Sequence, residues 1–221
     1  MSDTREREAI CRVGLSLFER GYAHATAGNI SVRLSDGGFL ITPTDASLGR
    51  LDPARLARLD ADGQQQGGDP ASKTIALHRA ICEAARRYDP ATSCVIHTHS
   101  THCVALTLRE ADRELLAPIT PYFVMKVGHV PVIAYRRPGS PETAADVRAA
   151  IVRYGDAGTP LRAVMLARLG PNVWHDSPDA AMAVLDELEE TARLACLVTP
   201  PPVPLDDAQI DELRRTFGAR W

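Results

Sequence analysis

Helix-forming and strand-forming patterns alternate along this chain, and that alternation restricts its fold more than any other feature. Amphipathic helices are predicted where apolar residues recur at helical spacing, in residues 4–20, 73–87, 141–154, 179–197 and 206–217, with a further helix from about Thr101. Strands are predicted where apolar runs are short or alternate, in residues 30–34, 39–42, 94–98, 130–135 and 163–167. The sequence therefore predicts one α/β domain whose helices cover a mostly buried sheet.

The ends of these elements have their own signals. Gly21 is typical of a helix C-terminus, and Ser72 and Ser177 have the side chains that cap helix N-termini. Residues 64–70 read as an exposed turn. We expect residues 1–221 to form a single domain, with a proline-rich joint at 200–204 and a C-terminal helical tail at 205–221.

Charge and composition exclude several classes of function. The formal net charge is −3 without a dense basic cluster, so no nucleic-acid interface is expected. No apolar run approaches the roughly 20 residues of a membrane span, and the charged first residues do not form a signal peptide. The 5 cysteines are odd in number and include no Cys-x-x-Cys pair, which favours reduced thiols. We therefore expect a cytoplasmic protein that binds a small molecule.

The segment from Cys94 to His99 is the strongest chemical signal. Apolar residues run directly into His97-Thr98-His99, and side chains two apart on a strand share a face. Imidazole suits zinc and related divalent ions, so His97 and His99 are candidate metal ligands. Two histidines do not complete a tetrahedral site. The other interpretation is a strand end whose histidines only form hydrogen bonds.

Small polar residues at three other places suit an anion such as phosphate. Gly28, Asn29 and Ser31 precede or begin a strand, and Thr44 follows another. Ser72 and Lys73 stand at a predicted helix N-terminus, where backbone N–H groups, hydroxyls and an ammonium can bind an anion together. Each of these signals alone is more typical of an ordinary turn than of a binding site.

In this order, the motifs resemble the class II aldolase/adducin family, and most closely its 3-oxo-tetronate 4-phosphate decarboxylase branch. The resemblance covers about residues 9–197. The motifs that carry it are Gly28-Asn29-Ile30-Ser31, Thr42-Pro43-Thr44, Pro70-Ala71-Ser72-Lys73, His97-Thr98-His99, Thr120-Pro121-Tyr122 and Gly170-Pro171, and, for the branch, Ser47–Leu51, Ser100–Ala105 and Pro121–Gly128.

The resemblance implies a three-layer α/β/α sandwich that assembles as a homotetramer with active sites between subunits. It implies a divalent metal, commonly zinc, which stabilises an enediolate after a carbon–carbon bond is cleaved. By the same resemblance, Tyr122 matches a tyrosine that acts as proton donor in a neighbouring subunit.

Three departures from the family pattern fall at chemical positions. Leu169 stands where the family has its third metal-binding histidine, after Arg168 in Ala167-Arg168-Leu169-Gly170-Pro171. Thr74 stands where the family has its acid/base glutamate, and a hydroxyl cannot transfer protons as a carboxylate does near neutrality. Asp45 replaces the glycine that commonly follows Thr-Pro-Thr.

Two functions remain open at this point. The first is a diverged carbon–carbon lyase acting on a small phosphorylated or carboxylated sugar-like substrate. In it Tyr122, Asp45 and Thr74 occupy the catalytic positions, Lys73 and Arg168 supply positive charge, and Asp45, His102, His129 or water completes the metal site. The second is a metal-free homologue that serves as a binding or assembly module.

Overall fold

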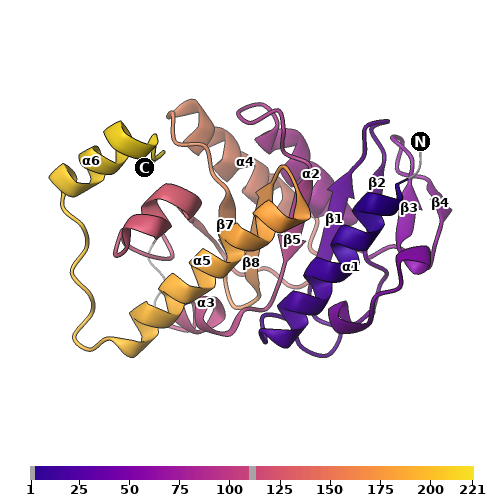
Figure 1. Cartoon of the computed structure of the whole chain (residues 1–221), viewed down its shortest axis with the longest axis horizontal. Coiled ribbons are helices and arrows are strands. Elements are labelled where there is room, and N and C mark those ends of the chain that lie inside the picture. The colour runs from indigo at the N-terminus through magenta and orange to yellow at the C-terminus, as the bar shows by residue number, and fades with distance from the viewer. Residues whose placement is uncertain (1–2, 110–112) are drawn as a thin grey trace.

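The described part of the chain forms one eight-stranded sheet between two layers of helices. The structure is a computed structural model that describes residues 3–109 and 113–221. The strand order is β4-β3-β2-β1-β5-β8-β7-β6. In Figure 1, α1 (Thr4–Glu19) and α5 (Pro178–Leu197) cross the near face, with α2 (Ile75–Ala85) and α4 (Glu142–Asp156) behind the sheet. The predicted three-layer α/β/α sandwich is confirmed.

Most neighbouring strands of this sheet run antiparallel. Only β6 and β7, among the described strands, pair in parallel. The strands are β1 (Asn29–Arg33), β2 (Phe39–Ile41), β3 (Ala57–Leu59), β4 (Gln65–Gly67), β5 (Cys94–His97), β6 (Val132–Ile133), β7 (Ala163–Leu166) and β8 (Gly170–His175).

Alternation along β5 decides which face each side chain occupies. Cys94 and Ile96 pack in the apolar cluster under α1 and α5, whereas Val95 packs in the cluster under α2 and α4. His97 is the last residue of β5, so the same alternation puts it on the α2/α4 face. One face of the sheet therefore packs against α1 and α5 and the other against α2 and α4. His97 lies on the α2/α4 face.

Several helix ends follow the sequence signals. Gly21 has φ +75°, and the N–H groups of Gly21 and Tyr22 donate to the carbonyls of Phe18 and Leu17, which closes the C-terminus of α1. The Ser177 hydroxyl accepts from the N–H of Ala180 at the start of α5. The remaining helical segments are α3 (Thr101–Leu106), α6 (Asp207–Phe217), which starts with a capping box at Asp206, the π-helical η3 (Phe123–Val127) and the 3-10 segments η1 (Leu48–Arg50) and η2 (Pro53–Arg55).

The structure corrects the predicted secondary structure at β3, β4, β8 and the start of α2. The stretch 64–70, predicted as a turn, contains edge strand β4, and strands β3 and β8 were not predicted. The helix predicted from residue 73 begins at Ile75, and Ser72 does not cap it: its N-cap residue is Thr74, which makes no capping hydrogen bond through its side chain. Within residues 3–109 and 113–221, every helix is too short or too polar to cross a membrane.

Candidate functional site

A polar row crosses the middle of the sheet on the α2/α4 face. In the strand register, His97 of β5 pairs with Asn29 of β1 on one side and with Asn172 of β8 on the other. All three side chains are at least nine-tenths buried. Apolar residues occupy most of this face elsewhere, so the row marks a place where the fold keeps polar groups inside.

His97 is held in one tautomer with one nitrogen available. Its Nδ1 lies 2.9 Å from the carbonyl oxygen of Pro171, which can only accept, so Nδ1 donates and Nε2 keeps its lone pair. Burial lowers the pKa of His97 to about 4, with a smaller effect from His99. Burial also lowers the pKa of His99. Both imidazoles are therefore neutral at pH 7, the form in which histidine binds a metal.

His78 lies on α2 behind this row. Its Nδ1 is 2.7 Å from the hydroxyl of Ser31, and burial lowers the pKa of His78 to about 3. His78 therefore forms a structural hydrogen bond through Nδ1. Ser31, predicted to bind substrate, is completely buried and engaged with His78.

Unsatisfied polar atoms concentrate around His97. Among buried side-chain atoms of the described residues, those without a hydrogen-bond partner include Asn29 Oδ1, His78 Nε2 and both amide atoms of Asn172. A buried polar atom without a partner costs about 1–3 kcal/mol. Unpaired polar atoms grouped in this way are typical of a site that binds a polar ligand, and not of a core that is complete within the protein.

The loop before α2 lies against the loop after β2. Pro43 and Ala71 form an antiparallel bridge, the N–H of Thr44 donates to the carbonyl of Pro70, and the N–H of Ser72 donates to that of Thr42. The hydroxyls of Ser72 and Thr74 are 2.9 Å apart, while Lys73 is exposed. The structure thus brings the predicted anion-binding segments 42–44 and 70–74 together.

Asp45, one of the departures from the family pattern, and Arg168, the residue before Leu169, have left-handed backbone conformations. Asp45 has φ +57° and Arg168 has φ +64°, and both side chains are exposed. Left-handed backbone favours glycine and asparagine, and this explains a glycine at the first position. Because bridge 43–71 runs antiparallel, Asp45 continues away from Ser72 and toward Asp69. Leu169 is partly buried and packs against the apolar cluster under α2 and α4.

Gly28 fixes the loop before β1 against the end of β5. It has φ +88°, and a Cβ there would lie 2.9 Å from the carbonyl oxygen of His97. The same loop brings His24 beside His99, with ring centroids 6.1 Å apart, while those of His97 and His99 are 5.2 Å apart. His24 was not predicted as a site residue. Its position beside His99 follows from the pairing of β1 with β5, which was not predicted.

The structure contradicts two of the alternatives for a third ligand. The Nδ1 of His102 is 2.8 Å from Glu189 of α5, beside Cys103 in the cluster under α1 and α5. His129 stacks on Trp221 with centroids 4.3 Å apart. His102 is therefore engaged with Glu189 on the α1/α5 side, and His129 packs on Trp221 beside Glu114. No three His, Cys, Asp or Glu side chains of the described residues, Asp45 included, already form a metal site.

Tyr122 lies on the other side of the sheet from His97. Its side chain is 60% exposed, and the following residue, Phe123, packs in the cluster under α1 and α5. Tyr122 lines an open groove of about 760 Å³ together with Met125 and residues of α5. Within one chain, Tyr122 therefore does not face the polar row.

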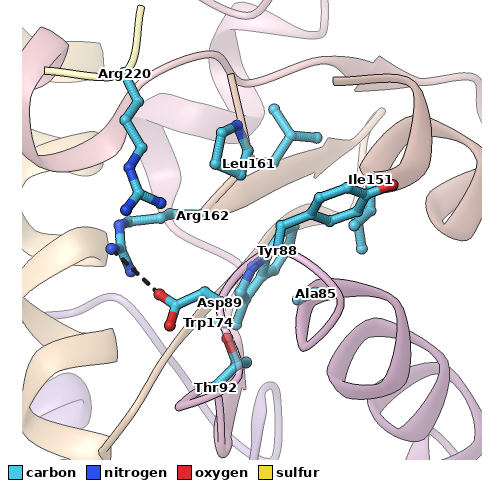
Figure 2. Close-up of a pocket in the computed structure, with 10 residues that line it drawn as sticks. Ala85, Tyr88, Asp89, Thr92, Ile151, Leu161, Arg162, Trp174 and Arg220 are labelled. Carbon is cyan, nitrogen blue, oxygen red and sulfur yellow. Dashed lines mark ion pairs between the residues drawn. The ribbon is translucent and has the colours of Figure 1, made fainter. Parts of the chain in front are cut away.

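A small internal cavity lies elsewhere, between α2, α4 and β8. Figure 2 shows Arg162 paired with Asp89 at its edge, with Tyr88 and Trp174 among the lining residues. Its volume of about 10 Å³ is at the lower limit for one water molecule. This cavity is too small for a substrate, so the polar row remains the better candidate.

Known proteins are similar to this chain in sequence and in fold. Residues 8–196 match the family described as Class II Aldolase and Adducin N-terminal domain. A 3-oxo-tetronate 4-phosphate decarboxylase from Cupriavidus necator is 48% identical, over 100% of this chain and 99% of that protein.

Two solved structures agree with this. The structure of YgbL from Klebsiella pneumoniae has a TM-score of 0.85 and 38% identity, covering 97% of this chain and 100% of that one. L-fuculose-1-phosphate aldolase from Thermus thermophilus has a TM-score of 0.71 and 28% identity, covering 86% and 92%. The resemblance inferred from the motifs is confirmed: the chain belongs to the class II aldolase and adducin N-terminal domain family.

Proposed function

We propose that this protein is a carbon–carbon lyase of the class II aldolase type that decarboxylates a small phosphorylated 3-oxo sugar acid. One observation carries the proposal: Asn29, His97 and the start of α2 converge on one face of the sheet, with polar atoms that lack partners. The 3-oxo-tetronate 4-phosphate decarboxylase of C. necator, identical at 48% of positions, supports the substrate class.

The absence of a carboxylate at Thr74 favours decarboxylation over aldol cleavage. Aldol cleavage requires a base to take a proton from a hydroxyl group, and a threonine cannot do so near pH 7. A 3-oxo acid is already ionised at its carboxylate. Its bond to the α-carbon breaks as CO2 leaves, and the electron pair passes into the neighbouring carbonyl to give an enolate. One proton delivered to the α-carbon then completes the product.

The chain's own residues take three roles in this reaction. Asn29 and Ser72, with the backbone of Gly28 and the hydroxyl of Thr44, bind the phosphate and hydroxyls, and Lys73 and Arg168 add positive charge. Tyr122 of a second copy delivers the proton. Tyr122 and the apolar side chains exposed on α1 and α5 support a homo-oligomer, which we propose is a tetramer. The free cysteines of the described residues suit the cytoplasm.

His97 and His99 suit a divalent metal, which we propose is zinc. The available Nε2 of His97 fits this, and so does the 5.2 Å ring separation, because two imidazoles on one tetrahedral zinc have centroids about 5 Å apart. Leu169 and Thr74 supply no ligand. When bound, such an ion would stabilise the negative charge that develops on the substrate oxygen.

The test is release of CO2 from 3-oxo-tetronate 4-phosphate by the purified oligomer. We expect turnover that is lost in His97→Ala and Asn29→Ala, and an unchanged rate in Arg215→Ala, which alters the distant helix α6. Aldol cleavage of fuculose 1-phosphate is expected only after Thr74→Glu. A protein that releases no CO2, with or without added zinc, would contradict the proposal.

One observation favours the alternative of a non-catalytic binding module. Leu169 packs with Ile75 and Leu77 against the apolar cluster, so the family's third ligand position has become part of the core. A module of this kind would bind the phosphorylated acid without turning it over. Calorimetric binding of the acid in the absence of CO2 release would identify it.

A further inference from the structure

The histidine pair lacks its third protein ligand, and the loop before β1 carries a histidine that no family motif includes. β1 and β5 are antiparallel, with Asn29 opposite His97, so the residues before Asn29 run beside the residues after His97. This topology is why His24, five positions before Asn29, reaches His99, two positions after His97.

The two ring separations that involve His99 suit one shared ion. The ring centroids of His97 and His99 are 5.2 Å apart, close to the about 5 Å expected for two imidazoles on a tetrahedral zinc. The centroids of His24 and His99 are 6.1 Å apart, about 1 Å wider. His24 is exposed, so rotation about its own side-chain torsions can close that difference without moving the core.

Two further observations support this place. Gly28 holds the His24 loop against β5, since even a Cβ there would lie 2.9 Å from the His97 carbonyl. The buried Oδ1 of Asn29, next to His97 in the register, has no partner among the described residues. The backbone of the loop before β1 is thus held against β5, while the buried Asn29 Oδ1 beside it lacks a hydrogen-bond partner.

We propose that His24 is the third protein ligand of a divalent metal site with His97 and His99, and that it replaces the histidine lost at Leu169. The described residues contain no closed three-ligand set, so His24 turns inward when the ion binds. The fourth position is left to water or to a substrate oxygen. This inference rests on the proposed function, because it assumes that the lyase uses a metal.

The experiment measures zinc binding by titration calorimetry on the chelator-treated full chain. We expect one Zn²⁺ per chain, at least about tenfold weaker binding in His24→Ala, and loss of binding in His97→Ala. Thr26→Ala is the matched control, since it alters the same exposed loop without removing an imidazole, and it should change the affinity by less than about twofold. The visible spectrum of bound Co²⁺ should change in His24→Ala and not in Thr26→Ala.

A second variant distinguishes failure of His24 as a ligand from failure of the whole metal site. Leu169→His should raise zinc affinity at least about tenfold, and His24→Ala should have little further effect in that background. Unchanged zinc binding in His24→Ala, together with loss in His97→Ala, would overturn the role of His24 and leave the metal proposal standing. If the unaltered protein binds no zinc but still releases CO2, the metal site fails while the proposed lyase function survives.

Discussion

Two histidine clusters on opposite faces of the same sheet differ in how completely their polar atoms are hydrogen-bonded. Under α5, Glu189 is 4% exposed, and its carboxylate accepts from the backbone N–H groups of His102 and Cys103 and pairs with the His102 ring. Under α2, Asn29, His78 and Asn172 keep polar atoms without partners among the described residues. The first cluster is complete within the chain and therefore stabilises the fold. The second is incomplete, as a binding site is before its ligand arrives.

The largest effect should come from breaking the complete cluster. Glu189→Ala leaves the buried N–H groups of His102 and Cys103 without an acceptor, so we expect a loss of about 3–5 kcal/mol in the free energy of unfolding. Urea denaturation measures it. Glu190→Ala, on the same helix but with an exposed partner in Arg193, should cost less than about 1 kcal/mol. Equal losses in the two variants would mean that the Glu189 cluster contributes no more to stability than an exposed ion pair does.

Filling the incomplete cluster with an apolar side chain should stabilise the protein. Asn172→Val removes two buried amide atoms that lack partners, and we expect a gain of about 1–2 kcal/mol in urea denaturation. Ser31→Ala provides the opposite control on the same face, because it takes away the partner of His78 Nδ1 and should destabilise. A loss of stability in Asn172→Val would mean that the amide is satisfied by a bound water.

The incomplete cluster should also make stability depend on pH. The pKa of His78 is about 3 when folded and near 6.5 when unfolded, so below pH 6.5 the unfolded chain binds a proton that the folded chain does not. The free energy of unfolding should therefore fall as the pH falls from about 6.5 toward 4, by up to about 1.4 kcal/mol per pH unit from this group. His78→Gln should reduce that slope by one proton, and an unchanged slope would contradict the assignment.

The smallest expected effect concerns the hairpin between β7 and β8. Arg168 has φ +64°, a conformation that asparagine tolerates better than arginine, so Arg168→Asn should stabilise by up to about 1 kcal/mol. Thermal unfolding measures it. Arg137→Asn, also on an exposed turn but not at a positive φ, should leave the midpoint unchanged. A shift of the same size in both variants would rule out backbone strain as the cause.

The contrast between the clusters also shows how far the sequence could predict the structure. The helices α1 and α5 and strand β5 were predictable because their apolar spacing and end residues agree with their burial. Strand β8 was not, because Pro171 and Asn172 are typical of loops; Pro171 fits as the second residue of the strand, near its start.

The candidate site was predictable only in part. His97 and His99 were found from two-residue spacing, a local property. Finding His24 and the pairing of Asn29 with His97 requires the order of strands in the sheet, and that order depends on contacts distant in sequence. The satisfied state of His102 likewise depends on Glu189, 87 positions away.

Tyr122 stands on the α1/α5 face, while the polar row occupies the α2/α4 face of the same chain. In the proposed arrangement, each active site contains residues from two chains. The fraction of chains that have a complete active site therefore depends on the protein concentration. Turnover per chain should rise with protein concentration and level off once association is saturated. Chains carrying Tyr122→Phe and chains carrying His97→Ala should each be inactive alone, yet regain activity when their subunits are mixed, because the hybrid contains one centre with both groups intact.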